Sequence, residues 1–338
     1  MAVTTWSDIL KFQGFDGSKE IADEVRLNVP EFTGEDAFGT RFEIGRGQST
    51  TSQDFIEGLI RKETAPPDPF RNVNEGLVAS KGVYERTLFK LTNAGGFVQY
   101  DRALIDRDRT RGGLLMRAEA TRVLEDAIRA LGIQFFYGGT ADGGASTKGF
   151  QGLEAFVGAA QTISAGGSAG AGATTGLSSA YFVKFSEVNG VCWLFGRDGS
   201  FNVSDIERAE IPDPADATRL IPVYRQLMEF YPGLSFNSQY AAVRVANIQT
   251  ATATTPASLS TTALTDKHLL VALDTFKGDR PDALFMSRKA GILLGASRQP
   301  SITISGRSIV GGQFEVPREF YGIPILYTDS LGENEAAV

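Results

Sequence analysis

Cysteine and histidine are almost missing from this chain, which has one of each among its 338 residues. Because Cys192 has no partner within the chain, an internal disulfide and a thiolate metal cluster are both excluded. A run of about 18–20 apolar residues is also missing, so no membrane-spanning helix is expected. The opening MAVTTWSDILKFQ has neither a basic start nor a continuous apolar stretch, so we expect no secretory signal. We expect a soluble protein that folds in a reducing cytoplasm.

An excess of positive charge is missing as well. The 33 Lys and Arg residues are outnumbered by 40 Asp and Glu residues, which gives a net charge of −7. This balance argues against a surface built mainly to grip nucleic acid. Hydrophobic residues make up 42% of the chain, which is enough for a packed core, and the length allows two domains or one large domain with insertions.

Motifs that mark an active site are also lacking. Gly166-Gly-Ser168-Ala-Gly170 matches the nucleophile pattern G-x-S-x-G, but its flanks are Gly/Ala/Ser tracts where that pattern needs a strand and a helix. The single histidine, His268, lies in the polar start of a helical segment, where a solvated or capping role is expected. The chain has no G-x-x-x-x-G-K-[ST] phosphate loop. We therefore expect no catalytic residue and no cofactor, and keep a serine hydrolase using Ser168 and His268 as an alternative.

Two clusters of charged side chains favour surface structure over a binding site. Asp205, Asp213 and Asp216 lie in a polar, proline-broken stretch without EF-hand spacing, so we expect a solvated loop and no metal site. Between residues 101 and 111 arginines alternate with aspartates, which indicates a salt-bridged helix start more than a nucleic-acid site.

The strongest positive signal is a long helix over Thr110–Tyr137. Its apolar residues recur three or four positions apart, and Leu124, Ile128 and Leu131 are predicted to form its core face. The glycines that follow, Gly138-Gly139, are expected to end it by taking the left-handed conformation. A helix of this length needs a broad surface to lie on.

Two segments before this helix are predicted to extend from the body. Residues 1–45 form an arm, because Gly and Pro interrupt their apolar residues and leave little to bury. Residues 46–92 form an extended loop that is too polar to make a core, with prolines at positions 66, 67 and 69 that exclude helix. Tyr84–Leu91 and Gly96–Tyr100 flank a turn and are predicted to be two strands joined by it. Such faces favour self-assembly, because contacts with other copies would bury them.

The second half is rich in predicted strands. The Gly-, Ala- and Ser-rich run 158–180 is expected to be a mobile surface loop. Strands are predicted at Ser179–Phe185, Val191–Phe195, Tyr240–Ala246, Ala283–Met286, Gly312–Val316 and Ile323–Tyr327, and helices at Leu264–Phe276 and Ser287–Ala296. The predicted fold class is α+β.

An ordered set of segments across nearly the whole chain resembles the major capsid proteins of tailed bacteriophages. These segments are Asp68–Gly76, the long helix ending in Phe-Phe-Tyr-Gly-Gly, Gly149–Leu153, Gly233 through Asn247, Ala283–Arg288 and Tyr321–Asp329. Each suits an ordinary strand or turn by itself, and the likeness lies in their order.

The resemblance implies an architecture with a spine helix on a β-sheet and an extended β-hairpin loop. Its parts would be an N-terminal arm (1–45), the extended loop (46–92), a peripheral domain (93–149) with the spine helix at about 110–137, a mixed α/β axial domain (150–310) and a C-terminal return to the peripheral domain (311–338). Contacts between subunits are expected from charged residues of the loop, namely Arg61, Lys62, Glu63, Arg71, Glu75, Lys81 and Arg86.

The implied function is that of a major capsid protein. It would self-assemble through pentamers and hexamers into an icosahedral shell around double-stranded DNA, and would be made in the host cytoplasm. A cellular nanocompartment shell of the same fold is an alternative. Besides copies of itself, we expect a separate scaffolding protein, a portal and decoration proteins as partners, with DNA bound weakly and without sequence specificity, and no membrane.

Overall fold

The computed structural model describes most of the chain outside its N-terminal arm and several loops. The described residues are 28–35, 46–50, 55–62, 70–76, 81–107, 109–138, 148–166, 176–196, 202–213, 216, 218–250, 264–276, 280–298, 302–304, 307–309, 316–333, 335 and 338. Among the helices of these residues, none combines the length and the hydrophobicity needed to cross a membrane.

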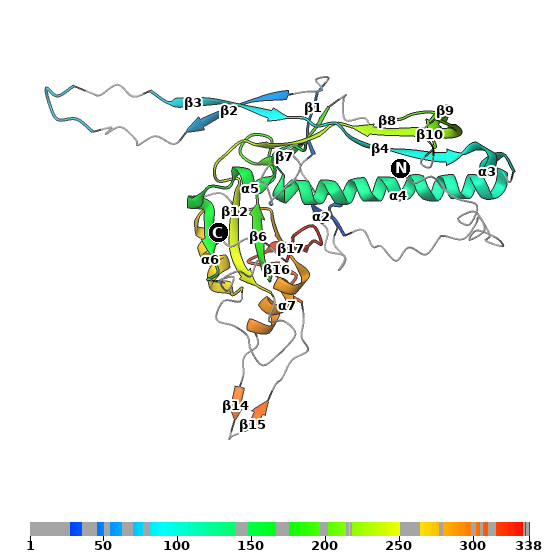
Figure 1. Ribbon diagram of the computed structural model, residues 1–338. Coiled ribbons are helices and arrows are strands. Elements are labelled where there is room, and N and C mark those ends of the chain that lie inside the picture. The colour runs from blue at the N-terminus through cyan, green and yellow to red at the C-terminus, as the bar shows by residue number, and fades with distance from the viewer. Residues whose placement is uncertain are drawn as a thin grey trace.

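Helices and strands are mixed along the chain, which confirms the predicted α+β class (Figure 1). The helices are α2 (Pro30–Thr33), α3 (Arg102–Arg107), α4 (Arg109–Tyr137), α5 (Leu153–Phe156), the 3-10 turn η1 (Ala159–Gln161), α6 (Asp266–Asp274) and α7 (Arg288–Ser297). The strands of the first half are β1 (Arg46–Thr50), β2 (Phe55–Lys62), β3 (Val83–Lys90), β4 (Ala94–Asp101), β5 (Thr162–Ser164), β6 (Leu177–Val183), β7 (Val191–Gly196), β8 (Asn202–Val203) and β9 (Glu207–Pro212). Those of the second half are β10 (Leu220–Phe230), β11 (Pro232–Phe236), β12 (Ala242–Gln249), β13 (Ala283–Met286), β14 (Ile302–Ile304), β15 (Arg307–Ile309), β16 (Glu319–Phe320) and β17 (Ile323–Tyr327).

The long helix is confirmed, and α4 lies along a sheet of four strands that includes β4 and β10 (Figure 1). Val98, Tyr100 and Met228 of this sheet pack against Met116, Ala120 and Val123 of the helix. The side chains of α4 that pack on this sheet therefore lie beside the predicted stripe of Leu124, Ile128 and Leu131. Leu131 is buried, with 4% of its surface exposed, whereas Leu124 and Ile128 are half-buried.

The prediction that Gly138-Gly139 ends α4 in the left-handed conformation is wrong for Gly138 and stays untested for Gly139, which lies outside the described residues. Gly138 is absent from the glycines with positive φ, so it does not use the left-handed conformation. A Cβ atom at this position would lie 2.3 Å from the carbonyl oxygen of Phe150. Glycine is needed here because the chain at Phe150 passes close to the end of the helix.

The end of α4 enters an aromatic core around Trp193 of β7, which is 1% exposed. The ring of Phe135 stacks on Trp193 with centroids 5.2 Å apart, and Phe32 and Phe150 meet the indole edge-on at 5.6 and 5.8 Å. Phe136 packs edge-on against Phe135 at 5.0 Å. We call these five residues the aromatic core.

A six-stranded sheet in the order β16-β17-β13-β6-β12-β5 forms the largest layer. Residues 242–248 of β12 are all buried, so this strand does not have the exposed face that its predicted alternation implied. The reason is that both faces of the sheet are covered, one by the helices α6 and α7 and the other by the end of α4.

The prediction of a surface loop over 158–180 is wrong at its two ends. β5 and the first half of β6 belong to the six-stranded sheet, and Ala165 and Ala180 are 3% and 0% exposed. The pairing of β6 with β12 and β13 satisfies its backbone groups on both sides, which the composition of the run does not reveal. Residues 167–175 of the run lie outside the described part.

The predicted pairing on either side of residues 93–96 is also wrong. β3 pairs with β2, and β4 pairs with β10, so the two segments belong to different sheets. A Cβ atom at Gly95 would lie 2.1 Å from the carbonyl oxygen of Met228. The glycine therefore permits close pairing with β10 rather than a turn back onto β3.

Two sets of strands cross the boundaries that the resemblance implied. β10 lies within residues 150–310 but pairs with β4 beside α4. β16 and β17 lie within residues 311–338 but pair in the six-stranded sheet, and do not return to the sheet beside α4. Strand partners are set by distant backbone groups that satisfy each other, so order along the chain does not decide them.

The remaining predicted elements have mixed outcomes. The structure confirms the strands β6, β7, β13 and β17 and the helices α6 and α7 at the predicted places. The salt-bridged helix start is confirmed in α3, where Arg102 Nε lies 3.1 Å from Asp106 Oδ2. Residues 207–212 of the predicted polar loop form β9, which pairs with β10. Most of the predicted strand Gly312–Val316 lies outside the described part.

We expect the substitution Leu131→Ala to lower the free energy of unfolding by about 2–5 kcal/mol, because it empties a buried position. Leu124→Ala should cost less, since that side chain is half-buried. Ile133→Ala is the matched control: this side chain is 47% exposed, and alanine favours helix. Urea unfolding followed by circular dichroism measures all three. Equal losses at positions 124 and 131 would contradict the packing described here.

Candidate assembly surfaces

The hairpin of β2 and β3 projects away from the body of the subunit (Figure 1). Its strands pair in register from Phe55 opposite Lys90 to Lys62 opposite Val83. Among the described strands, no third one joins this pair. Because an isolated two-stranded hairpin is at best marginally stable in water, its projection favours a role in contact with another molecule.

A turn beyond the paired strands presents two apolar side chains to solvent. The backbone amide of Glu75 donates to the carbonyl oxygen of Asn72 at 3.1 Å, and the amide of Asn72 donates to Glu75 Oε2 at 2.9 Å. Asn74 takes a φ of 68°, a left-handed conformation that asparagine tolerates better than most residues. Phe70 is 84% exposed and Val73 is 92% exposed. We call residues 70–76 the tip; sequence reasoning did not single out its apolar side chains.

The predicted contact residues are distributed along this projection. Arg71, Glu75, Lys81 and Arg86 are exposed, and Glu75 also closes the turn of the tip. Arg61 and Lys62 lie in β2, opposite Tyr84 and Val83. Glu63 lies outside the described residues. Their contact with a second subunit stays a prediction.

The base of the hairpin is fixed in the body: the extended loop was expected to be too polar to make a core of its own, but its last residues join the core of the body. Phe89 and Leu91 are 2% and 4% exposed and belong to the same cluster as the end of α4. The amide of Thr92 donates to the carbonyl oxygen of Pro232 at 3.0 Å. The alternation of apolar Phe89 and Leu91 with polar Lys90 and Thr92 was the available sequence signal. The projection therefore leaves the body at a packed joint.

A buried ionic cluster fastens the end of α4 to the six-stranded sheet. Arg244 of β12 is 4% exposed, and its Nη2 lies 2.9 Å from Glu335 Oε2 while its Nη1 lies 2.7 Å from Glu154 Oε1. Its Nε donates to Ser179 Oγ at 2.9 Å. The hydroxyls of Tyr137 and Ser179 both donate to Glu335. Burial and the adjacent Glu335 carboxylate raise the pKa of Tyr137, so its hydroxyl stays a donor.

Sequence reasoning missed this cluster, although one signal was present. Arg244 interrupts the apolar run Ala-Ala-Val-Arg-Val-Ala, and a charge inside a buried strand needs a partner. Its partner Glu335 lies 91 positions away, so spacing along the chain does not identify it.

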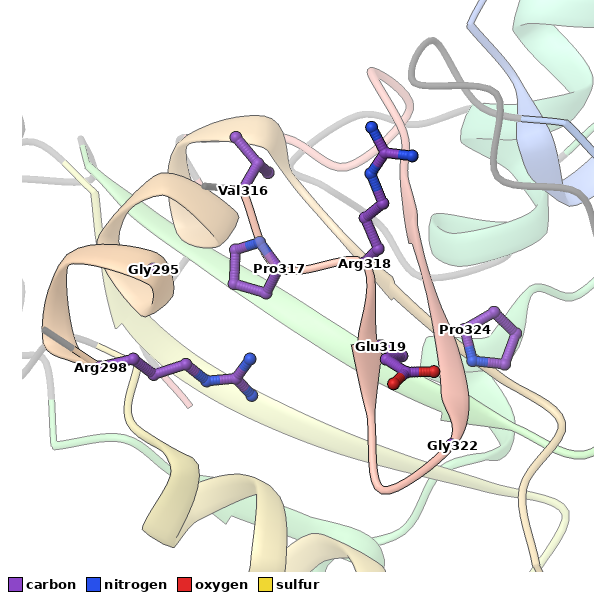
Figure 2. Close-up of a pocket in the computed structure, with 8 residues that line it drawn as sticks. All are labelled: Gly295, Arg298, Val316, Pro317, Arg318, Glu319, Gly322 and Pro324. Atoms are coloured by element: carbon purple, nitrogen blue, oxygen red, sulfur yellow. The ribbon is translucent and has the colours of Figure 1, made fainter. Parts of the chain in front are cut away.

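A hollow of about 800 Å³ lies between the end of α7 and the β16–β17 hairpin. Figure 2 shows Arg298 extending from α7 toward this hairpin, while the side chain of Arg318 points away from Arg298. Arg298 is held by Asp266, with Nη2 2.7 Å from Oδ1 and Nε 3.0 Å from both oxygens. The walls include Val316, Pro317 before β16 and Pro324 of β17. Among the residues that line it, none offers a serine, cysteine, lysine or histidine nucleophile.

Of Ser168 and His268, the two residues of the alternative hydrolase, the structure describes only His268. His268 occupies the first turn of α6, where its Nδ1 lies 3.2 Å from Thr265 Oγ1 and accepts from the Thr265 amide at 3.4 Å. This confirms the capping role, and burial lowers the pKa of His268. Ser168 lies outside the described residues. Within the described part, no three His, Cys, Asp or Glu side chains come together as a metal site.

Residues 53–338 match the sequence profile of the major capsid protein GP7. The chain belongs to this family. Comparison with curated proteins gives no match.

Several solved structures are similar to this GP7-family protein. A chain in the structure of bacteriophage Epsilon15 has 17% sequence identity and a TM-score of 0.65, over 100% of this chain and 98% of that one. A chain of the bacteriophage JBD30 capsid has 12% identity and a TM-score of 0.43, over 97% and 99% of the two chains. A chain of the holo-SrpI encapsulin complex from Synechococcus elongatus PCC 7942 has 9% identity and a TM-score of 0.43, over 74% and 97%.

The protein is therefore a major capsid protein, a structural component of a capsid shell. The α+β architecture, with its long helix and projecting hairpin, is the fold of this class.

We expect Arg244→Met to lower the free energy of unfolding by roughly 3–5 kcal/mol, because it leaves the Glu335 carboxylate buried without its cation. Adding Glu335→Gln should recover part of the loss, since the uncompensated charge is then removed. Lys289→Met, which breaks the exposed pair with Glu333, is the control and should cost no more than about 1 kcal/mol. Chemical denaturation measures the four proteins. An Arg244→Met protein as stable as the wild type would show that the cluster does not hold α4 to the sheet.

Proposed function

We propose that this major capsid protein assembles through pentamers and hexamers into an icosahedral shell that encloses double-stranded DNA. The observation that supports the proposal most directly is the projecting hairpin, which carries exposed Phe70 and Val73 on a preformed turn. The packed joint at Phe89 and Leu91 holds this projection in a defined direction. A projection that is anchored at its base and carries apolar side chains on a preformed turn loses less conformational entropy when it contacts a neighbouring copy.

Apolar burial and charge have different parts in this contact. Full burial of a Phe or Val side chain contributes about 1.5–3 kcal/mol, whereas an exposed ion pair contributes about 0–1 kcal/mol. Phe70 and Val73 therefore supply most of the contact energy. The charges at Arg71, Lys81 and Arg86 set the register of the contact and make assembly sensitive to salt.

The enclosed DNA would meet a shell without a strong basic surface. The net charge of −7 favours weak binding without sequence preference, which leaves packaged DNA free to move along the wall. The proposal places synthesis in the host cytoplasm. It includes a portal, a separate scaffolding protein and decoration proteins as further partners, and no enzymatic activity of the chain itself.

The two alternatives predict different contents or activities. A nanocompartment shell would contain a cargo enzyme where a phage shell contains double-stranded DNA, so the contents of particles purified from producing cells distinguish the two. A serine hydrolase would release a reporter ester in a manner abolished by Ser168→Ala. The capping role of His268 in α6 disfavours that reading, because the ring nitrogen facing Thr265 is already engaged.

We expect the double substitution Phe70→Ser with Val73→Ser to leave the subunit folded and to prevent closed shells. Both side chains are exposed, so their loss removes no core packing within the subunit. Val188→Ser is the matched control, because Val188 is 75% exposed on a turn elsewhere. Circular dichroism tests folding, and sedimentation with negative-stain microscopy tests assembly. Normal particles from the double variant would overturn the proposed role of the tip.

We further expect dispersed subunits to bind double-stranded DNA weakly, with loss of binding as salt rises to physiological concentration. Fluorescence anisotropy at increasing salt with two unrelated DNA sequences measures this. A sequence-selective complex that persists at physiological salt would contradict the proposed passive wall.

A further inference from the structure

A short piece of the N-terminal arm, residues 28–35, is inserted into the body of its own subunit. The indole Nε1 of Trp193 donates to the carbonyl oxygen of Glu31 at 2.9 Å, and the ring of Phe32 meets that indole edge-on. The amide of Asp329 donates to the carbonyl oxygen of Asn28 at 3.3 Å. This piece, the arm segment, thus lies between α4, β7 and the residues after β17.

The side chain of Glu31 points into this contact and is fully buried, with 0% of the residue exposed. Among the described residues, neither of its carboxylate oxygens has a hydrogen-bond partner, and the neighbouring Ser330 Oγ has none either. A Cβ atom at Gly132 of α4 would lie 2.4 Å from Glu31 Oε1 and 2.3 Å from Ser330 Oγ. The carboxyl group therefore fits because α4 has a glycine at this turn, and it sits in a closed space.

Among the described residues that act on the Glu31 carboxyl, none is a cation that could compensate a negative charge. On α4 the residue next to Glu31 is Gly132. On β7 it is Trp193, whose indole donates a hydrogen bond to the backbone carbonyl oxygen of Glu31. From the segment after β17 come the hydroxyls of Thr328 and Ser330 and the carboxylate of Asp329. The charged neighbour is thus itself acidic. An ionised carboxylate in this space would be buried and unpaired, which is strongly unfavourable.

We propose that the arm segment is a proton-linked latch, docked on α4 while the Glu31 carboxyl is neutral and released when that carboxyl ionises. Burial raises the pKa of Glu31 to about 7, and the polarity of the nearby Ser330 and Thr328 hydroxyls, which form no direct hydrogen bond with the carboxyl, offsets this only in part. In the released arm its pKa returns to the ordinary value of 4.5. Between pH 4.5 and pH 7 the docked state therefore binds more protons than the released state. Docking therefore weakens as pH rises from 4.5 to 7, and it changes no further above 7.

Release would have a defined structural consequence. It would expose Trp193 and the face of α4 at Gly132, and it would free the arm segment for contact with another copy of the chain. This last step rests on the proposed shell function. The latch itself belongs to the single subunit, so a test on dispersed subunits separates its failure from failure of the shell proposal.

The test compares the wild type with Glu31→Gln, an amide of the same shape that cannot ionise. The background carries Trp6→Phe, which leaves Trp193 as the remaining tryptophan of the two in the chain. Hydrogen exchange of the Thr33 and Gly34 amides and Trp193 emission are followed from pH 5.5 to 8.5. Taking the ratio of wild-type to variant exchange rates at each pH cancels the intrinsic pH dependence of exchange. Glu35→Gln is the matched control, since Glu35 is exposed on the same segment.

We expect the wild-type exchange rate to rise about 30-fold relative to Glu31→Gln across this range, with most of the change below pH 7. Glu35→Gln should behave as the wild type. If Glu31→Gln does not fold, Asp329→Asn replaces it, because loss of that charge lowers the pKa of Glu31 and moves the transition to lower pH. A ratio that stays constant with pH, a transition that does not move in Asp329→Asn, or an equal effect of Glu35→Gln would each overturn the proposal.

Discussion

The architecture of this subunit depends on the insertion of the last turns of α4 into the aromatic core around Trp193. Phe135 stacks on the indole, Phe150 meets the indole edge-on, and Phe136 packs against Phe135. The approach is possible because Gly132 and Gly138 leave no side chain where the chain passes within contact distance. Because packed interiors are dense and do not deform continuously, this insertion fixes the direction of a long helix relative to the six-stranded sheet.

Several parts of the chain converge on the hydrophobic cluster that surrounds the aromatic core. The base of the projecting hairpin enters it through Phe89, the arm segment through Phe32, and the C-terminal residues through Leu331. The cluster of Arg244 and Glu335 adds a specific geometry, because a buried ion pair is satisfied in one arrangement of its partners and costly in others. This cluster therefore connects both extensions of the subunit, the hairpin and the arm segment, to one packed centre. A shell protein with repeated contacts requires such a connection.

The two extensions are held in opposite ways. The hairpin is fixed by apolar packing at its base, which does not respond to pH, and it presents apolar side chains at its tip. The arm segment is held through a contact that buries an acid without a partner. A subunit built in this way would keep one assembly surface permanently displayed while the availability of the other depends on protonation.

Local signals were sufficient for the elements that short stretches of sequence decide. The period of apolar residues gave α4 to within a residue, and apolar runs gave β13 and β17. The alternation of arginine and aspartate between residues 101 and 111 indicated the ionic start of the helical region, where the structure shows Arg102 paired with Asp106. The resemblance of ordered segments gave the family, which the match over residues 53–338 establishes.

The tertiary structure alone decided which strands pair and which polar groups are buried. β3 pairs with β2 and β4 with β10, although residues 84–100 looked like one hairpin. Gly138 serves a close approach of distant chain, and Glu31 and Arg244 are buried by segments far from them in sequence. Periodicity and turn residues act over a few positions, whereas strand partners, close approaches and buried charges are set by groups that meet only after the chain has folded.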